Sequence, residues 1–162
     1  MNNPFQLFDI ETQYFIDKQA VNEKYIALQK QFHPDNFATR TAKEKLMATQ
    51  ISANVVSAHK TLLDPIARAS ALLNLWGKDF DLANYISNDQ SLLITQMELR
   101  EQLDTANTDE YPALKQAWEK DFSNLEQEFA NYLTDKDLDK AAEIVLKMRY
   151  YQKLLTELDH KD

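Results

Sequence analysis

The chain contains no cysteine, one glycine and four prolines among its 162 residues. Without cysteine it has no disulfide framework, no thiolate metal ligands and no cysteine nucleophile. A β-protein needs many turns, and turns rely on glycine. The most frequent residues instead favour helix, among them alanine, leucine, glutamine, lysine and glutamate. These absences predict an all-α protein.

Long apolar runs are also missing. The longest stretches are a few residues, whereas a membrane-spanning helix needs about 20. The first ten residues, MNNPFQLFDI, have no basic segment followed by an apolar one, so they do not read as a signal peptide. We therefore expect a soluble, cytoplasmic protein without a membrane partner.

The net charge of −8 is divided unevenly along the chain. Residues 1–76 contain eight lysines and arginines against seven aspartates and glutamates, whereas residues 77–162 contain ten against nineteen. An acidic half repels the phosphate backbone of a nucleic acid. We therefore expect no nucleic-acid partner.

Two helices are predicted in the first half, separated by a loop that reads QFHPDNF. Asp17 has the position of an N-cap for the first helix, and Pro34 disfavours helical geometry at His33, where that helix should end. Its core-facing residues recur with 4-3-4 spacing: Val21, Tyr25, Leu28 and Phe32.

The second helix is predicted to open at Thr41, which has capping-box spacing to Glu44. Asp64 and Pro65 then predict the start of a shorter helix. We take residues 1–76 as one helical domain. The expected core stripe of the second helix is Met47, Ile51, Val55, Ala58 and Leu62.

Residues 77–89 have weak periodicity and several turn formers, so we take them as a linker between two domains. Ser87 and Gln90 have capping-box spacing before the next helix. Short connections between helices favour antiparallel neighbours, so residues 90–162 are predicted to form a three-helix bundle with Trp118 and Phe122 in its core. The three helices are expected at about 90–104, 110–133 and 137–158.

The loop between the first two helices carries His33, Pro34 and Asp35. The simplest interpretation is that Pro34 ends a helix and Asp35 caps a turn. As a catalytic pair, His33 and Asp35 lack a nucleophile and a third orienting group, and they are too few ligands for a metal. A carboxylate and an imidazole on an exposed loop suit recognition of an arginine on a partner. We therefore expect neither an enzyme nor a cofactor or metal site.

A His-Pro-Asp loop between two antiparallel helices resembles the J-domain, the module that activates DnaK-type ATPase chaperones. Basic residues around the loop would steer an acidic partner surface toward it. The residues expected to contact the chaperone are His33, Pro34, Asp35, Lys24 and Lys30. Six of the eight basic residues of the first half lie in this region: Lys18, Lys24, Lys30, Arg40, Lys43 and Lys45.

The first helix of the second domain has two apolar faces. At about 100° per residue, Leu92, Leu99 and Leu103 share the face that closes the bundle. Leu93, Ile94 and Met97 fall on roughly the opposite side, where charged residues rim or flank them. An apolar cluster with charged neighbours is a candidate partner surface, unless it packs on the first domain or the linker. The charged neighbours are Glu98, Arg100, Glu101 and Asp104.

Four segments are similar to the HscB family of co-chaperones for iron–sulfur cluster assembly: FHPDNF, LLDPIARASALL, LLITQMELREQLD and AAEIVLKMRYYQKL. With their order they cover essentially the whole chain. The missing N-terminal cysteine pair favours the bacterial type of the family over the eukaryotic one. We therefore expect a J-domain joined to a three-helix bundle in a bent or L-shaped molecule.

The resemblance implies two protein partners, the DnaK-type chaperone HscA and the cluster scaffold protein IscU. It implies that the protein delivers IscU to HscA and stimulates the ATPase of HscA. It also implies that the scaffold touches the outward face of the 90–104 helix and one tyrosine of the last helix. These client-binding residues are Leu93, Ile94, Met97, Glu98, Glu101 and Tyr150.

Three other functions stay open at this point. One is a J-domain co-chaperone that serves a different client with a general DnaK-type chaperone. Another is a DNA-binding regulator with a helix–turn–helix, against which the net charge and the interrupting proline argue. The third is a small hydrolase, for which the sequence offers no nucleophile–base pair.

Overall fold

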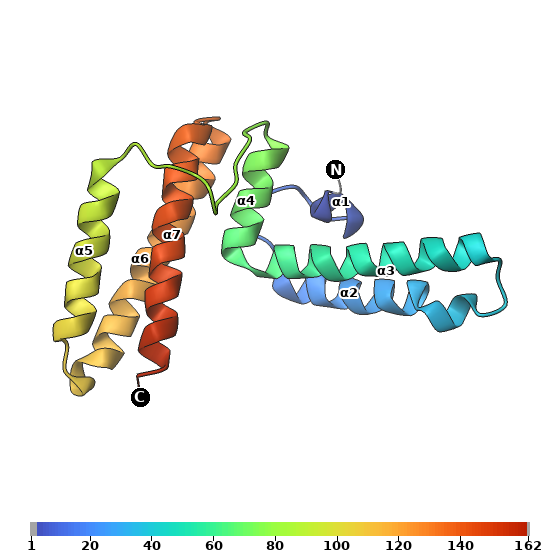
Figure 1. The fold of residues 1–162 in the computed structure, drawn as a ribbon, viewed down its shortest axis with the longest axis horizontal. Helices are drawn as coiled ribbons and strands as arrows, with labels where there is room; N and C mark the ends of the chain where they lie inside the picture. Colours follow the sequence, from blue (N-terminus) through green and yellow to red (C-terminus); the bar gives the residue numbers. More distant parts are fainter. Residues whose placement is uncertain (1–2, 162) are drawn as a thin grey trace. The chain divides into compact units, whose positions relative to one another are not determined.

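The computed structural model describes residues 3–161, and every regular element within them is helical (Figure 1). The predicted all-α fold is confirmed. By its internal contacts the chain divides into two compact units, Met1–Leu75 and Trp76–Asp162.

The first unit is built on an antiparallel hairpin of two helices, α2 and α3, which are joined through the short 3-10 turn η1 (Figure 1). The short helices α1 and α4 pack against α3. The elements are α1 (Pro4–Leu7), α2 (Lys18–Phe32), η1 (Pro34–Phe37), α3 (Ala42–Leu63) and α4 (Pro65–Leu75).

The predicted helix starts agree with the caps in the structure. The carboxylate of Asp17 accepts hydrogen bonds from the first backbone N–H groups of α2, and the Thr41 hydroxyl accepts one from Glu44 at the start of α3. Asp64 ends α3 and accepts a hydrogen bond from Ile66 in α4. Helix α2 ends at Phe32, directly before His33 and Pro34.

The core stripe of α3 differs from the prediction at its first position. Val55, Ala58 and Leu62 are buried as expected, whereas Met47 is half exposed and Ala48 is buried in its place. At about 100° per residue, Met47 lies about 80° away from Val55 around the helix, and Ala48 only about 20°. The phase of α3 therefore places Ala48, rather than Met47, in the core.

The second unit is a bundle of three helices (Figure 1). The two long helices α6 and α7 make the most extensive helix–helix contact, and α5 packs on α7. The elements are α5 (Gln90–Thr105), η2 (Thr108–Glu110), α6 (Tyr111–Thr134) and α7 (Leu138–Asp159).

Residues 77–89 belong to the second unit and contact α7. Lys78 forms an ion pair with Asp139, and Ser87 donates a hydrogen bond to Glu143. Ser87 does not cap α5 as predicted: the N-cap is Asp89, whose carboxylate accepts from Ser91, while the Ser87 hydroxyl accepts from the N–H of Asp89. The sequence showed a capping-box spacing, but Asp89 stands closer to the first helical turn.

One apolar cluster joins the three helices of the second unit at the end where α5 stops. Trp118 of α6 is buried there as predicted, and its indole N–H donates to the Gln102 side chain of α5 at 3.3 Å. Phe122 is only half-buried. The buried members of the cluster are Leu99, Leu103, Trp118, Leu154 and Leu158. The inward face of α5 is thereby fixed, which turns its other face outward.

Among residues 3–161, no helix is both long and apolar enough to cross a lipid bilayer.

Candidate partner-binding surfaces

The loop of the first unit exposes both of its ionisable side chains. His33 and Asp35 are 55% and 90% exposed. The backbone N–H of Asp35 donates to Nδ1 of His33 at 3.2 Å, so His33 acts as the N-cap of η1. The same Nδ1 atom lies 3.5 Å from the Asp35 carboxylate.

Two further contacts give the loop a defined shape. The side-chain amide of Asn36 donates a hydrogen bond to the backbone carbonyl of Lys30 in the last turn of α2. The backbone N–H of Asn36 donates to the carbonyl of His33 at 2.9 Å. One residue thus ties η1 back to α2 and satisfies a carbonyl at the helix end. The exposed His33 and Asp35 side chains therefore stand on an ordered support.

The two lysines predicted to contact the chaperone occupy different positions on α2. Lys30 is exposed and lies in the last turn of α2, next to the loop. Lys24 is half-buried. The two lysines are six positions apart, which places them about 120° apart around the helix. The structure therefore brings Lys30 to the loop but does not place Lys24 on the same face.

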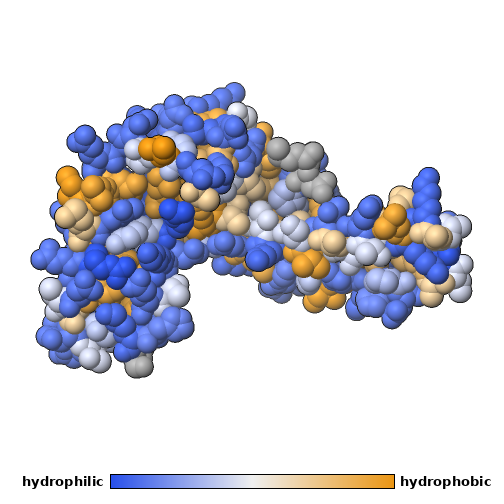
Figure 2. Space-filling model, in the orientation of Figure 1, coloured by the Kyte–Doolittle hydropathy of each residue, from blue (hydrophilic) through white to orange (hydrophobic). Residues whose placement is uncertain are grey.

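The outward face of α5 carries the apolar residues that its periodicity predicted. Leu93, Ile94 and Met97 are 62%, 57% and 64% exposed, whereas Leu92, Leu99 and Leu103 are buried. In the space-filling view, apolar side chains gather over the first turns of α5 (Figure 2). Large apolar side chains cost free energy when they are left in water, so a cluster of three marks a place where a partner can dock.

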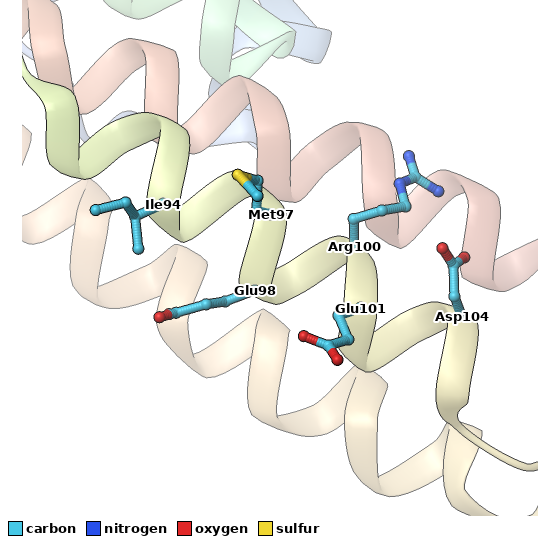
Figure 3. A pocket seen from close by; sticks show the side chains of 6 residues that line it. All are labelled: Ile94, Met97, Glu98, Arg100, Glu101 and Asp104. Carbon is cyan, nitrogen blue, oxygen red and sulfur yellow. The ribbon is translucent and has the colours of Figure 1, made fainter.

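An open hollow of about 550 Å³ lies along this face of α5. Glu98 and Glu101 lie on one flank, whereas Arg100 and Asp104 point to the other flank (Figure 3). The lining combines two apolar side chains with three carboxylates and one cation: Ile94, Met97, Glu98, Arg100, Glu101 and Asp104. Such a lining fits a segment that offers apolar and basic groups together.

Tyr150 of α7 lies beside α5 rather than in the lining of the hollow. Its hydroxyl donates to the backbone carbonyl of Gln96 at 3.1 Å, and its ring packs on the apolar cluster around Trp118. Of the six residues predicted to bind the client, three are exposed apolar residues of α5 and two are its carboxylates. Tyr150 is the half-buried member that connects this face to α7.

An ion pair on the same flank joins α5 to α7. Arg100 donates two hydrogen bonds to the Glu157 carboxylate, at 2.6 and 3.0 Å. Hydrogen bonding to Glu157, and then to Tyr150, raises the pKa of Arg100 above its ordinary value. The same contact lowers the pKa of Glu157. The sequence pattern predicts Arg100 beside the outward face of α5 but gives no sign of Glu157, because no spacing rule links residues 57 positions apart.

Within residues 3–161, no three histidines, aspartates or glutamates gather in a way that would hold a metal ion. His59 of α3 is stacked on Tyr25 and hydrogen-bonded to Asn22 at 2.8 Å. Burial lowers the pKa of His59. These contacts give His59 a packing role between α2 and α3.

The second unit matches a known family model. Residues 88–159 match the model described as the HSCB C-terminal oligomerisation domain. The match begins just before α5 and ends with α7, so it contains the whole outward face of α5.

Curated relatives extend the similarity to the whole chain. A protein of Haemophilus ducreyi named co-chaperone protein HscB homolog is 37% identical, over 98% of this chain and 95% of its own length. A homologue of the same name from Mannheimia succiniciproducens is 38% identical over the same shares.

Two solved structures have the same fold. The crystal structure of the human co-chaperone protein HscB superposes with a TM-score of 0.88 at 27% identity, covering 99% of this chain and 82% of that one. The chaperone HscB from Vibrio cholerae superposes with a TM-score of 0.84 at 33% identity, covering 98% and 96%.

Proposed function

The chain belongs to the HscB family of co-chaperones, and on this premise we propose that it delivers the iron–sulfur cluster scaffold protein IscU to the DnaK-type chaperone HscA. Its fold, a J-domain followed by a helical bundle, is that of the family. The relatives are named co-chaperones, and the proposal assigns this chain the same kind of role in iron–sulfur cluster assembly. In the proposed function the ATPase site belongs to HscA, whose hydrolysis this protein stimulates, and the protein works in the cytoplasm.

The outward face of α5 carries the proposal for the client. Leu93, Ile94 and Met97 are more than half exposed and lie close together on α5, which makes them one apolar cluster on the surface. The rim of carboxylates beside them favours a client with basic groups. The apolar residues would supply most of the affinity, and the carboxylates would select and orient the client.

The loop of the first unit supports the proposal for the chaperone. Asp35 offers an exposed carboxylate on an ordered turn, which suits bidentate hydrogen bonding to an arginine. His33 holds that turn through its Nδ1 atom. Lys30, exposed in the last turn of α2, would meet an acidic surface of the chaperone.

The proposed mechanism depends on both binding surfaces being on one chain. A client held by α5 is tethered to a chaperone held by the loop, so its effective concentration at the chaperone rises to about the millimolar range. Delivery and the signal for ATP hydrolysis are then coupled through the same molecule.

The test measures the steady-state ATPase rate of HscA with and without IscU. The native protein should raise the rate, and more so with IscU present. Asp35→Ala should leave the rate near its basal value in both conditions. Leu93→Ala combined with Met97→Ala should keep the stimulation that needs no client and lose the additional effect of IscU. Val56→Ala, which trims an exposed apolar residue of α3, serves as the control.

Each outcome separates one part of the proposal from the other. Equal rates with the native protein and with Asp35→Ala would contradict the role of the loop. An unchanged effect of IscU with the α5 double variant would contradict the client surface and point to a J-domain protein with a different client.

A further inference from the structure

Helix α5 bears the proposed client surface but is held to the bundle by a limited set of contacts. Its buried residues are Leu92, Leu99 and Leu103, of which the last two join the cluster around Trp118. Such a face resists separation of the helices better than it resists small rotations, because apolar packing is not directional. Directional contacts therefore matter for the orientation of α5.

The polar contacts between α5 and α7 supply that direction. The Glu157 carboxylate accepts two hydrogen bonds from the guanidinium of Arg100. This planar, bidentate contact fixes both the position and the orientation of the Arg100 guanidinium. One turn before Arg100, the carbonyl of Gln96 accepts the Tyr150 hydroxyl. The two contacts hold α5 at neighbouring turns on the flank that faces α7.

The same ion pair governs the charge of the hollow. Arg100 is the one cation among the six residues that line it, against three carboxylates. An Arg100 released from Glu157 stands one helical turn from Asp104, at the i, i+4 spacing at which opposite charges pair. It would then neutralise part of the acidic rim. Glu157, which receives two hydrogen bonds from Arg100, keeps the guanidinium on the α7 side together with Tyr150, and the rim stays available to basic groups.

We propose that Glu157 is a positioning residue for client binding, which holds Arg100 and α5 so that the apolar residues and the acidic rim stay open to the client. Glu157 acts through Arg100, because it is not among the residues that line the hollow. The inference rests on the proposed function, since it concerns the client surface of α5.

The experiment measures the affinity of purified IscU for the full chain by calorimetry. Glu157→Gln should weaken binding about tenfold, as expected if about one molecule in ten keeps the binding-competent arrangement. Arg100→Lys keeps the charge but loses the two-bonded geometry, and it should show most of the same loss. Glu157→Gln should also reduce the salt dependence of binding, because a freed Arg100 offsets the acidic rim.

The matched control is Asp159→Asn. Asp159 lies on α7, two residues from Glu157, and forms a 2.9 Å ion pair with Lys115 of α6, away from the hollow. Its loss removes another ion pair between helices of the bundle and should leave the affinity for IscU unchanged. A merely structural role for Glu157 predicts the same behaviour for both variants.

A charge exchange separates positioning from direct contact. Arg100→Glu combined with Glu157→Arg rebuilds the pair in reverse, so it should recover most of the affinity that Arg100→Glu alone loses. A double variant as weak as the single one would overturn the proposal, because it would mean that Arg100 itself touches the client.

The remaining outcomes distinguish this proposal from the one on which it rests. If the native chain and the Leu93→Ala, Met97→Ala double variant bind IscU equally, the proposed client surface is wrong. If that double variant loses binding and Glu157→Gln binds like the native chain, only the positioning role is overturned.

Discussion

Charged side chains in the second unit are of two kinds. Lys140 and Asp137 lie three positions apart at the start of α7, with 3.6 Å between their charged groups, which is a contact of neighbours along the chain. Arg100 and Glu157 come from different helices and make two short hydrogen bonds, with about a third of each side chain exposed. The first kind contributes little to stability because water screens it and the side chains stay mobile. The second also defines how two helices meet.

Glu157 should give the stability of the protein a measurable dependence on pH. Its contact with Arg100 lowers its pKa below the ordinary 4.5. A carboxyl group with a lowered pKa stabilises the fold above its unfolded pKa and loses that contribution as the pH falls through its folded pKa. Solvent screening keeps the contribution below about 1 kcal/mol.

Urea unfolding of the native chain and of Glu157→Gln, at pH values from 7 down to 3, measures this contribution. The native chain should be the more stable of the two at pH 7, and the difference should shrink below about pH 4.5. A difference of the same size at pH 7 and pH 3 would show that the carboxylate charge of Glu157 does not stabilise the fold.

Among the elements, helix starts and ends were predictable because they depend on local chemistry. Asp17 and Thr41 cap α2 and α3 as predicted, and Pro34 stops α2 by restricting His33. The start of α5 is the exception, because Asp89 and not Ser87 caps it. The helical phase would also have corrected the stripe of α3, because Ala48, which is buried, lies only about 20° from Val55, whereas the half-exposed Met47 lies about 80° from it.

The candidate binding surface on α5 also combines features that one helix predicts with features that depend on packing between helices. Periodicity alone predicted that Leu93, Ile94 and Met97 face outward, because the opposite residues of α5 form a continuous apolar stripe. The partnership of Arg100 with Glu157, and of Tyr150 with Gln96, depends on how α5 packs on α7. No pattern within either helix contains that information.

The same substitution to alanine should cost much more stability on the buried face of α5 than on its exposed face. Leu103→Ala removes a fully buried side chain from the cluster around Trp118 and should lower the free energy of unfolding by about 3 kcal/mol. Leu93→Ala trims a 62% exposed side chain and should change it by less than about 0.5 kcal/mol. Urea unfolding followed by tryptophan fluorescence measures both.

Binding of IscU to the same two variants completes the comparison. Leu93→Ala should weaken binding, whereas Leu103→Ala should bind normally at temperatures where it remains folded. Loss of stability in Leu93→Ala as large as in Leu103→Ala would mean that Leu93 is part of the core, which would remove the basis for a client surface on α5.

At the scale of the whole molecule, the charge is divided between the two units. The first contains eight basic and seven acidic residues, and the second ten and nineteen. The units therefore offer different electrostatic surfaces, which favours different partners for each. A chain with two partners can bind the client and activate the chaperone independently, or it can bridge the two. The two possibilities predict different ATPase rates in a mixture of two variants that each lack one surface.

Bridging requires that both surfaces be intact on one chain. A mixture of Asp35→Ala protein and the Leu93→Ala, Met97→Ala double variant contains a working loop and a working client surface, but on separate molecules. The client on the first variant is not tethered to the chaperone engaged by the second, so the gain in effective concentration is lost. The mixture should therefore not restore the extra ATPase stimulation that IscU gives with the native chain.

The measurement compares HscA turnover with IscU for the native chain, each variant alone and the equimolar mixture. It is made at concentrations where size-exclusion chromatography gives a monomer, so that mixed oligomers do not reunite the two surfaces. The mixture should give the mean of the two variants. Restoration of the native rate would contradict bridging, because it would show that client binding and chaperone activation are independent activities that need no covalent connection.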